Sequence, residues 1–185
     1  INGEWVDPIS DQTMLVINPA TEEQIGTVAL GNASDVDVAV EAASAAFDQF
    51  SQTTKMDRLD LLKSVMVIPE RRLEDLAQAM RMEMGAPITM ARSSQADAAI
   101  GHLQGFIDAL EEHNERAKLR NGDIMVHEPV GVCGLITPWN WPINQITLKV
   151  LPALATGCTC ILKPSEHTPI SAMIYAEILN EAGYP

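Results

Sequence analysis

The sequence has 185 residues, of which 46% are hydrophobic and 20% are charged, and its formal net charge is −13. These values are typical of a soluble globular protein with a core of its own. The charge argues against a general nucleic-acid binder, because phosphate contacts need clustered Lys and Arg, and the twelve present are scattered along the chain. No apolar run reaches the roughly 18 residues that span a membrane and no apolar leader is recognisable, so we expect a cytoplasmic protein without a membrane partner.

The first thirty residues combine short β-type runs with turn residues. Strand character is found at Glu4–Val6, Met14–Ile17 and Ile25–Leu30, and the segment Asn18–Thr21 has the composition of a turn. Together they predict a small antiparallel meander.

Residues 34–112 show the apolar period of helices. We expect Ser34 to cap the first helix, and a second helix to continue until Pro69 ends it or starts a third. The third helix should stop at Gly85, and a fourth should bury a stripe within Ile100–Leu110. The methionines of this helical layer occur at core spacing, so a packing role is expected for them.

The helical period stops in the charged stretch Arg116–Asp123, which contains the turn pair Asn121-Gly122. Strand alternation resumes in Ile124–Glu128. The pattern predicts a linker or a strand that reaches another surface.

The last third of the chain has an α/β pattern. The apolar runs Val130–Ile136 and Cys158–Leu162 have the composition of parallel strands, and we expect the first of them to be buried on both faces. A helix over Ile143–Ala155 separates them, and another should begin at Thr168 or Ser171. This order predicts a Rossmann-like parallel sheet, preceded by antiparallel strands and a helical layer.

The cysteines and histidines give no sign of a metal site. Cys133, Cys158 and Cys160 lie in apolar strand-like runs, so we expect buried core thiols, and their odd number and spacing fit neither disulfides nor zinc. The four histidines are far apart along the chain. No metal is expected.

Ligands of open α/β sheets bind outside the carboxyl ends of the strands, which selects the loops 137–142 and 163–168. In the first loop, two prolines bracket Asn140 and restrict the backbone around it. A neutral amide held at a strand end can stabilise a developing oxyanion, but the same residue could equally be the cap of the helix that follows.

The second loop places a cation and a carboxylate close together. Lys163 can donate and Glu166 can accept hydrogen bonds, which suits the vicinal hydroxyls of a ribose. A solvated loop with a surface ion pair is the simpler interpretation of the spacing alone. Neither a G-x-G-x-x-G nor a Walker A sequence is present.

Several motifs along the chain carry a family resemblance. They are Ile1–Trp5, Val16–Thr21, Glu83–Pro87, Glu128–Gly134, Pro138–Pro142, Pro152–Gly157 and Lys163–Pro169. In this order and spacing they resemble the aldehyde dehydrogenase superfamily, and the likeness covers essentially the whole chain. It implies an NAD(P)-dependent reaction in which a cysteine thiolate attacks an aldehyde, the thiohemiacetal gives up hydride, and a glutamate-activated water releases the acid.

The resemblance also implies roles for individual residues. Asn140 would donate to the oxyanion, and Lys149 matches a lysine that some members use in a proton relay, although an ordinary helix lysine is nearly as good an interpretation. The cofactor-binding residues implied are Ile136, Thr137, Pro138 and Trp139 along the dinucleotide and Lys163, Ser165 and Glu166 at its adenosine end. A carboxylate there disfavours a 2′-phosphate, so NAD is expected, with NADP possible.

The sequence begins at Ile1 without Met and stops at Pro185, just after an expected helix, so we expect both ends to be cut. The family's catalytic cysteine, glutamate base and glycine-rich turn lie downstream of anything present, so we expect the fragment to be inactive. We expect residues 1–115 and 130–185 to belong to the cofactor-binding domain and 116–129 to be a linker and oligomerisation strand of a homodimer or homotetramer. The alternatives are a short non-catalytic relative acting as a binding or assembly module and an acylating, coenzyme A-dependent enzyme.

Overall fold

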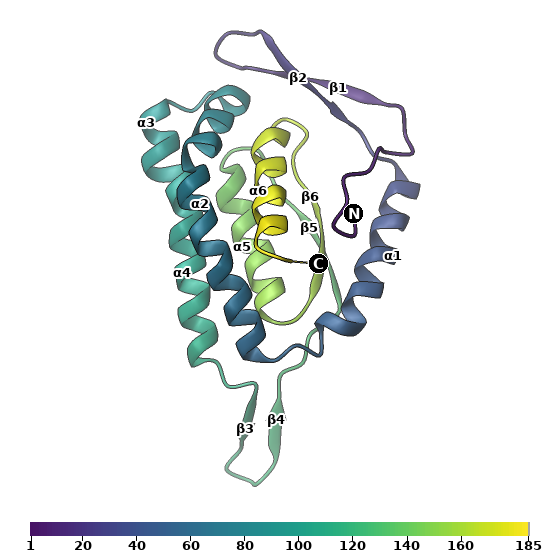
Figure 1. Ribbon diagram of the computed structural model, residues 1–185, viewed down its shortest axis with the longest axis vertical. Helices are drawn as coiled ribbons and strands as arrows, with labels where there is room; N and C mark the ends of the chain where they lie inside the picture. Colours follow the sequence, from purple (N-terminus) through teal and green to yellow (C-terminus); the bar gives the residue numbers. More distant parts are fainter. Residues whose placement is uncertain (185) are drawn as a thin grey trace.

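The computed structural model describes residues 1–184, except for the side chains of Val67, Pro69 and Glu70 (Figure 1). The strands are β1 (Thr13–Ile17), β2 (Gln24–Ala29), β3 (Arg116–Lys118), β4 (Ile124–Val126), β5 (Val132–Ile136) and β6 (Thr159–Lys163). The helical elements are α1 (Ala33–Phe50), α2 (Lys55–Met84), α3 (Ile88–Met90), the π-helical segment η1 (Ala91–Ala96), α4 (Asp97–Glu112), α5 (Pro142–Ala155) and α6 (Pro169–Glu181).

The chain folds as a mixed α/β structure. Helices α2, α4, α5 and α6 pack side by side, and the pair β5–β6 lies between this helical layer and α1 (Figure 1). The apolar stripes of all four helices meet in one core, whose fully buried members include Leu62, Leu76, Met80, Leu103, Ile146, Leu151 and Ile178. The burial of these side chains is the main force that joins the two halves of the chain.

The predicted β-α-β-α unit is confirmed. β5 and β6 pair in parallel, with Val132 opposite Thr159 and Ile136 opposite Lys163, and α5 connects them. The prediction that the first of these strands is buried on both faces is wrong, because Ile136 is 73% exposed. Within the described residues only β6 pairs with β5, so the carboxyl end of β5 projects without cover.

The amino-terminal strands differ from the prediction. β1 and β2 form an antiparallel hairpin, but Glu4–Val6 is not a strand. Trp5 is 60% exposed, so this segment lacks the packing that would hold it in a sheet. The predicted three-stranded meander is therefore a two-stranded hairpin.

The first helix is capped by Asn32, not by Ser34. The Asn32 side chain accepts from the backbone N–H groups of Ser34 and Asp35, and the Asp35 carboxylate accepts from the N–H of Asn32. This reciprocal pair is a capping box. Ser and Asn are both good caps, and each of these two has an acid three residues on, Asp37 for Ser34 and Asp35 for Asn32, so the local pattern did not distinguish them.

Helix α2 is continuous through Pro69, so the predicted break there is wrong; the side chain of Pro69 lies outside the described residues. Leu62 and Val65 before this position and Leu76 and Met80 after it are buried in the same core. Packing along the whole length therefore outweighs the local preference of proline to end a helix.

The end of α2 follows the prediction. Gly85 closes the helix with a left-handed backbone (φ 75°), and a Cβ at this position would approach Cγ of Pro19 to 2.9 Å. Both the backbone conformation and the close approach require glycine.

The charged stretch after α4 forms the hairpin β3–β4, which projects from one end of the molecule (Figure 1). Its base is fixed by Arg58, a buried side chain that donates to the carbonyls of Thr53 and Ala155 and pairs with Glu115. Of the two predicted alternatives, a linker or a strand that reaches another surface, the structure shows a strand, β4; the contact with another surface stays a prediction.

Candidate functional site

The two predicted loops meet at one edge of the sheet. Both begin where a parallel strand ends, and the backbone N–H of Thr137 donates to the carbonyl of Lys163 at 3.3 Å, which extends the β5–β6 ladder by one bond. The structure therefore brings together the loops 137–142 and 163–168, as the strand-end rule predicts.

The first loop offers an apolar surface to solvent. Ile136 is 73% exposed and Trp139 is 53% exposed, and Pro138 between them is also exposed. Thr137 is the exception, because it is buried and contributes through its backbone bond to the second loop. The exposed side chains of Ile136, Pro138 and Trp139 form an apolar shelf against which a flat ring could pack.

Asn140 is exposed, and no hydrogen bond of its side-chain amide is found among the described residues. Its backbone carbonyl accepts a long bond (3.5 Å) from the buried amide of Gln95 in η1. The N-cap of α5 is Trp141, and it makes no side-chain capping bond. The interpretation of Asn140 as a helix cap is therefore wrong, and its amide is available to a ligand.

Lys149 lies on α5, nine residues beyond Asn140, which corresponds to roughly 13 Å along a helix. Its half-buried ammonium donates to the Gln145 side chain at 3.3 Å. The structure places Lys149 on the helix that starts at the site, but it does not bring Lys149 to the loop.

The second loop is held by its own polar groups. Lys163 Nζ lies 2.8 Å from a carboxylate oxygen of Glu166, and this bond is the main cause that holds the pKa of Glu166 below its usual range. Ser165 is buried, and its Oγ accepts from the N–H of His167. The surface ion pair expected from spacing is thus present, and it leaves one Glu166 oxygen and two Lys163 protons for other partners.

Glu83 is a functional candidate that the sequence reasoning missed. It is only 3% exposed, and its carboxylate accepts from the N–H groups of Ile170 (2.6 Å) and Ser171 (3.1 Å) and from the Ser171 hydroxyl. Burial raises the pKa of Glu83 to about 7, against these hydrogen bonds. The available signal was that Glu83 follows two buried core residues of α2, Met80 and Leu76, by three and seven positions, which places an acid on the buried face of the helix.

The three cysteines lie at or beside the strands, away from the loops. Cys158 is buried as predicted, whereas Cys133 and Cys160 are only half-buried. Burial raises the pKa of Cys133, and it raises that of Cys160 to about 11. Burial also opposes ionisation of Cys158, but hydrogen bonds, chiefly from Thr156 and the Gly131 backbone, outweigh it and lower its pKa.

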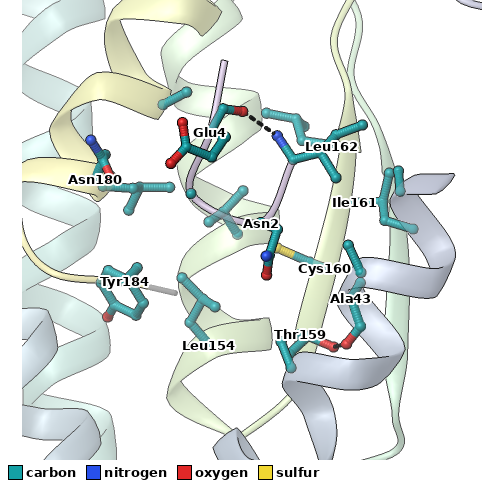
Figure 2. Close-up of a pocket in the computed structure, with 18 of the residues that line it drawn as sticks. Asn2, Glu4, Ala43, Leu154, Thr159, Cys160, Ile161, Leu162, Asn180 and Tyr184 are labelled. Carbon is teal, nitrogen blue, oxygen red and sulfur yellow. Dashed lines mark hydrogen bonds between the residues drawn. The ribbon is translucent and has the colours of Figure 1, made fainter. Parts of the chain in front are cut away.

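Two cavities are described, and none of the predicted site residues lines either of them. One, of about 400 Å³, lies between α1, β6 and α6, where Asn2 and Glu4 of the amino-terminal segment lie near Cys160 and Leu162 (Figure 2). The candidate site is therefore an open edge of the sheet. Among the described residues, no set of three or more His, Cys, Asp and Glu is arranged to hold a metal ion, and no helix is both long and apolar enough to cross a membrane.

A parallel β-α-β-α unit with polar loops at the carboxyl ends of its strands is the arrangement in which open α/β proteins bind ligands. Comparison with known proteins makes the class specific. The chain belongs to the aldehyde dehydrogenase family, which it matches over residues 5–185.

Several relatives and solved structures are similar over the whole chain. It is 48% identical to a 3-succinoylsemialdehyde-pyridine dehydrogenase of a Pseudomonas species, and it spans 39% of the length of that protein. The structure matches an aldehyde dehydrogenase of Bartonella henselae (46% identity, TM-score 0.98, 40% of that chain). It also matches a mutant aldehyde dehydrogenase of Pseudomonas syringae in complex with NAD+ and octanal (45% identity, TM-score 0.97, 38% of that chain).

Proposed function

We propose that this chain is part of an enzyme that oxidises an aldehyde to a carboxylic acid with NAD, and that it supplies the oxyanion donor and the adenosine end of a Rossmann-like cofactor site. The observation that carries the proposal is the amide of Asn140 at the end of β5, which has no hydrogen-bond partner among the described residues and lies beside the loop that contains Lys163 and Glu166. The complex of the P. syringae relative with NAD+ and octanal supports both the cofactor and the substrate class.

Asn140 would donate its amide N–H to the oxygen of the aldehyde as that oxygen becomes negative. A neutral amide does not titrate, so the donation is the same at every working pH. The proline on each side, Pro138 and Pro142, restricts the backbone, which reduces the reorganisation needed when the substrate arrives.

The residues at the sheet edge fit a dinucleotide. The shelf of Ile136, Pro138 and Trp139 would pack against it, while Lys163 and Glu166 would bond to the adenosine ribose, with Ser165 fixing the loop. NAD, when bound, supplies the acceptor for hydride. The ionised Glu166 would repel a 2′-phosphate, so we propose NAD rather than NADP.

The nucleophile and the general base belong, in this proposal, to sequence beyond these 185 residues. None of the three cysteines lies in either strand-end loop, and the chain spans about two fifths of its relatives' length. Lys149 is proposed as a proton carrier, because its half-buried amine lies on α5, the helix that begins at the site.

We further propose that residues 116–129 form the contact of a homodimer or homotetramer. Along the chain, these residues separate the two parts of the cofactor-binding domain, residues 1–115 and 130–185. Ile124, Met125 and Val126 on the projecting strand β4 are 40–59% exposed. Such a row of apolar side chains on an edge strand suits pairing with a second copy.

The test is Asn140→Ala in the full-length protein, with aldehyde-dependent reduction of NAD as the readout. Loss of one oxyanion donor should lower kcat by roughly two to three orders of magnitude. Asn144→Ala is the matched control, because Asn144 lies in the first turn of α5, close to the loop, and is already paired with His102 at 2.6 Å. If Asn140→Ala changes the rate no more than Asn144→Ala does, Asn140 is not the oxyanion donor.

A further inference from the structure

Helix α6 begins at a point where its backbone needs a partner. Its N-cap, Thr168, makes no side-chain capping bond, so the first N–H groups of the helix would be unsatisfied. Glu83 of α2, 87 residues before Ile170 in the chain, fills this need through its bonds to Ile170 and Ser171. The start of α6 is thus fixed by a buried carboxylate from outside the helix.

Glu83 itself is in a position that is unfavourable for a carboxylate. It lies in the last turn of α2, where the helix dipole is negative, and it is 3% exposed. Among the described residues, the positive end of α6 and the Ser171 hydroxyl compensate for these two costs. A Gln or an apolar residue would fill the same space with a smaller desolvation cost. The presence of a buried carboxylate therefore indicates that a specific geometry is needed here.

The geometry that Glu83 fixes is that of the second loop. Residues 164–168 connect the last ladder position of β6 to the first turn of α6, and the loop closes on itself through Thr168 N–H to the Ser165 carbonyl at 3.1 Å. Glu166 lies three residues before the start of α6. A shift of the first turn of α6 must therefore move Glu166 relative to Lys163.

We propose that Glu83 is a positioning residue for cofactor binding, which holds the Lys163–Glu166 pair in the arrangement that receives the adenosine ribose. The inference rests on the proposed function, and it adds to it a residue on α2 that touches neither substrate nor cofactor. Ser171 shares this positioning role, because its backbone N–H and its hydroxyl both donate hydrogen bonds to Glu83.

The experiment compares Glu83→Gln with the unchanged full-length enzyme at pH 8. The amide keeps the size of the side chain but turns an N–H group toward the N–H of Ile170 or Ser171, so the first turn of α6 must move. We expect the KM for NAD to rise by about tenfold or more, the size of one lost charged hydrogen bond, while kcat at saturating NAD stays within about twofold. Ser171→Ala, which removes only the hydroxyl contact, should raise the KM in the same direction by less.

Arg72→Gln is the matched control, because Arg72 joins the same two helices at the far end of α6, through ion pairs with Glu177 and Glu181. This variant loosens α2 from α6 without touching the loop, so its KM for NAD should not change. An equal KM for Glu83→Gln and Arg72→Gln would overturn the positioning role, and so would a fall in kcat with no change in KM.

Glu166→Ala separates failure of this inference from failure of the proposed function. If Glu166→Ala weakens NAD binding but Glu83→Gln does not, only the inference fails. If Glu166→Ala leaves NAD binding unchanged as well, the cofactor loop itself is wrongly assigned. Circular dichroism of each variant verifies that its helices are retained.

Discussion

The loop after β5 and the loop after β6 start from equivalent positions but are built in opposite ways. In the first, the amide of Asn140 has no partner within the part of the chain that the structure describes, and Ile136 and Trp139 are more than half exposed. In the second, Lys163 and Glu166 pair with each other, and Glu83 fixes the helix that follows. Under the proposed function this difference is a division of labour, in which the first loop presents a donor for chemistry and the second is prearranged for binding.

The largest effect is expected next to the second loop, at the first turn of α6. The local stability of this turn should vary with pH because of Glu83. Burial raises the pKa of Glu83 to about 7, above its ordinary value of 4.5. The folded state therefore favours the protonated form of Glu83. The contribution of this group to the free energy of unfolding is full below pH 4.5 and is lost as the pH rises through about 7. The loss should be on the order of 3 kcal/mol.

Hydrogen exchange of the amides in the first turn of α6, corrected for the intrinsic rate, would measure this change. Between pH 4.5 and 8 their protection should fall in the unchanged protein and stay level in Glu83→Gln, which cannot titrate. The amides of the first loop provide the internal comparison. Because the Asn140 side chain does not titrate, their protection should not follow the same pH profile. A parallel pH profile for the two proteins would mean that Glu83 does not titrate between pH 4.5 and 8.

An intermediate effect is expected for Glu166→Ala on cofactor affinity. Removing a charged acceptor from the ribose should weaken NAD binding by roughly ten- to a hundredfold, and it should narrow the preference for NAD over NADP because the repulsion of a 2′-phosphate is gone. Thermal stability should hardly change, because the Lys163–Glu166 pair is exposed to solvent. Calorimetric titration with each cofactor tests this, and Glu181→Ala, in an exposed ion pair on α6, is the control.

The sequence predicted the features that follow from local pattern and from general rules of α/β sheets. The parallel pair β5–β6, its connecting helix and the adjacency of Thr137 and Lys163 all follow from hydrophobic runs and the strand-end rule. The left-handed Gly85 was also predictable, because glycine at the end of an apolar period is a strong local signal.

The features that the sequence did not predict depend on contacts between distant segments. Glu83 reaches Ile170 over 87 positions, and no local rule pairs an acid of one helix with the start of another. The continuity of α2 likewise depends on a core built by α4, α5 and α6, which outweighs the propensity of Pro69. The exposure of Ile136 has the same origin, because the composition of a strand does not tell how many strands flank it.

The smallest effect is expected for the cysteines, which lie at or beside the strands rather than in either loop. Cys133, Cys158 and Cys160 are half-buried or buried, and burial suppresses the thiolate of Cys160 at neutral pH. Replacing all three by Ala in the full-length enzyme should leave kcat within about twofold, because a nucleophile needs an accessible thiolate at the site.

Inactivation by iodoacetamide gives the complementary measurement for the triple variant. If the nucleophile belongs to sequence beyond these residues, the variant should be inactivated at the same rate as the unchanged enzyme. Cys158 is the member of the set that could contradict this, since hydrogen bonds lower its pKa despite burial. The contradicting result would be that both the triple variant and Cys158→Ala lose their activity and their sensitivity to the reagent. The chemistry would then lie at the start of β6, and the two loops would have no division of labour.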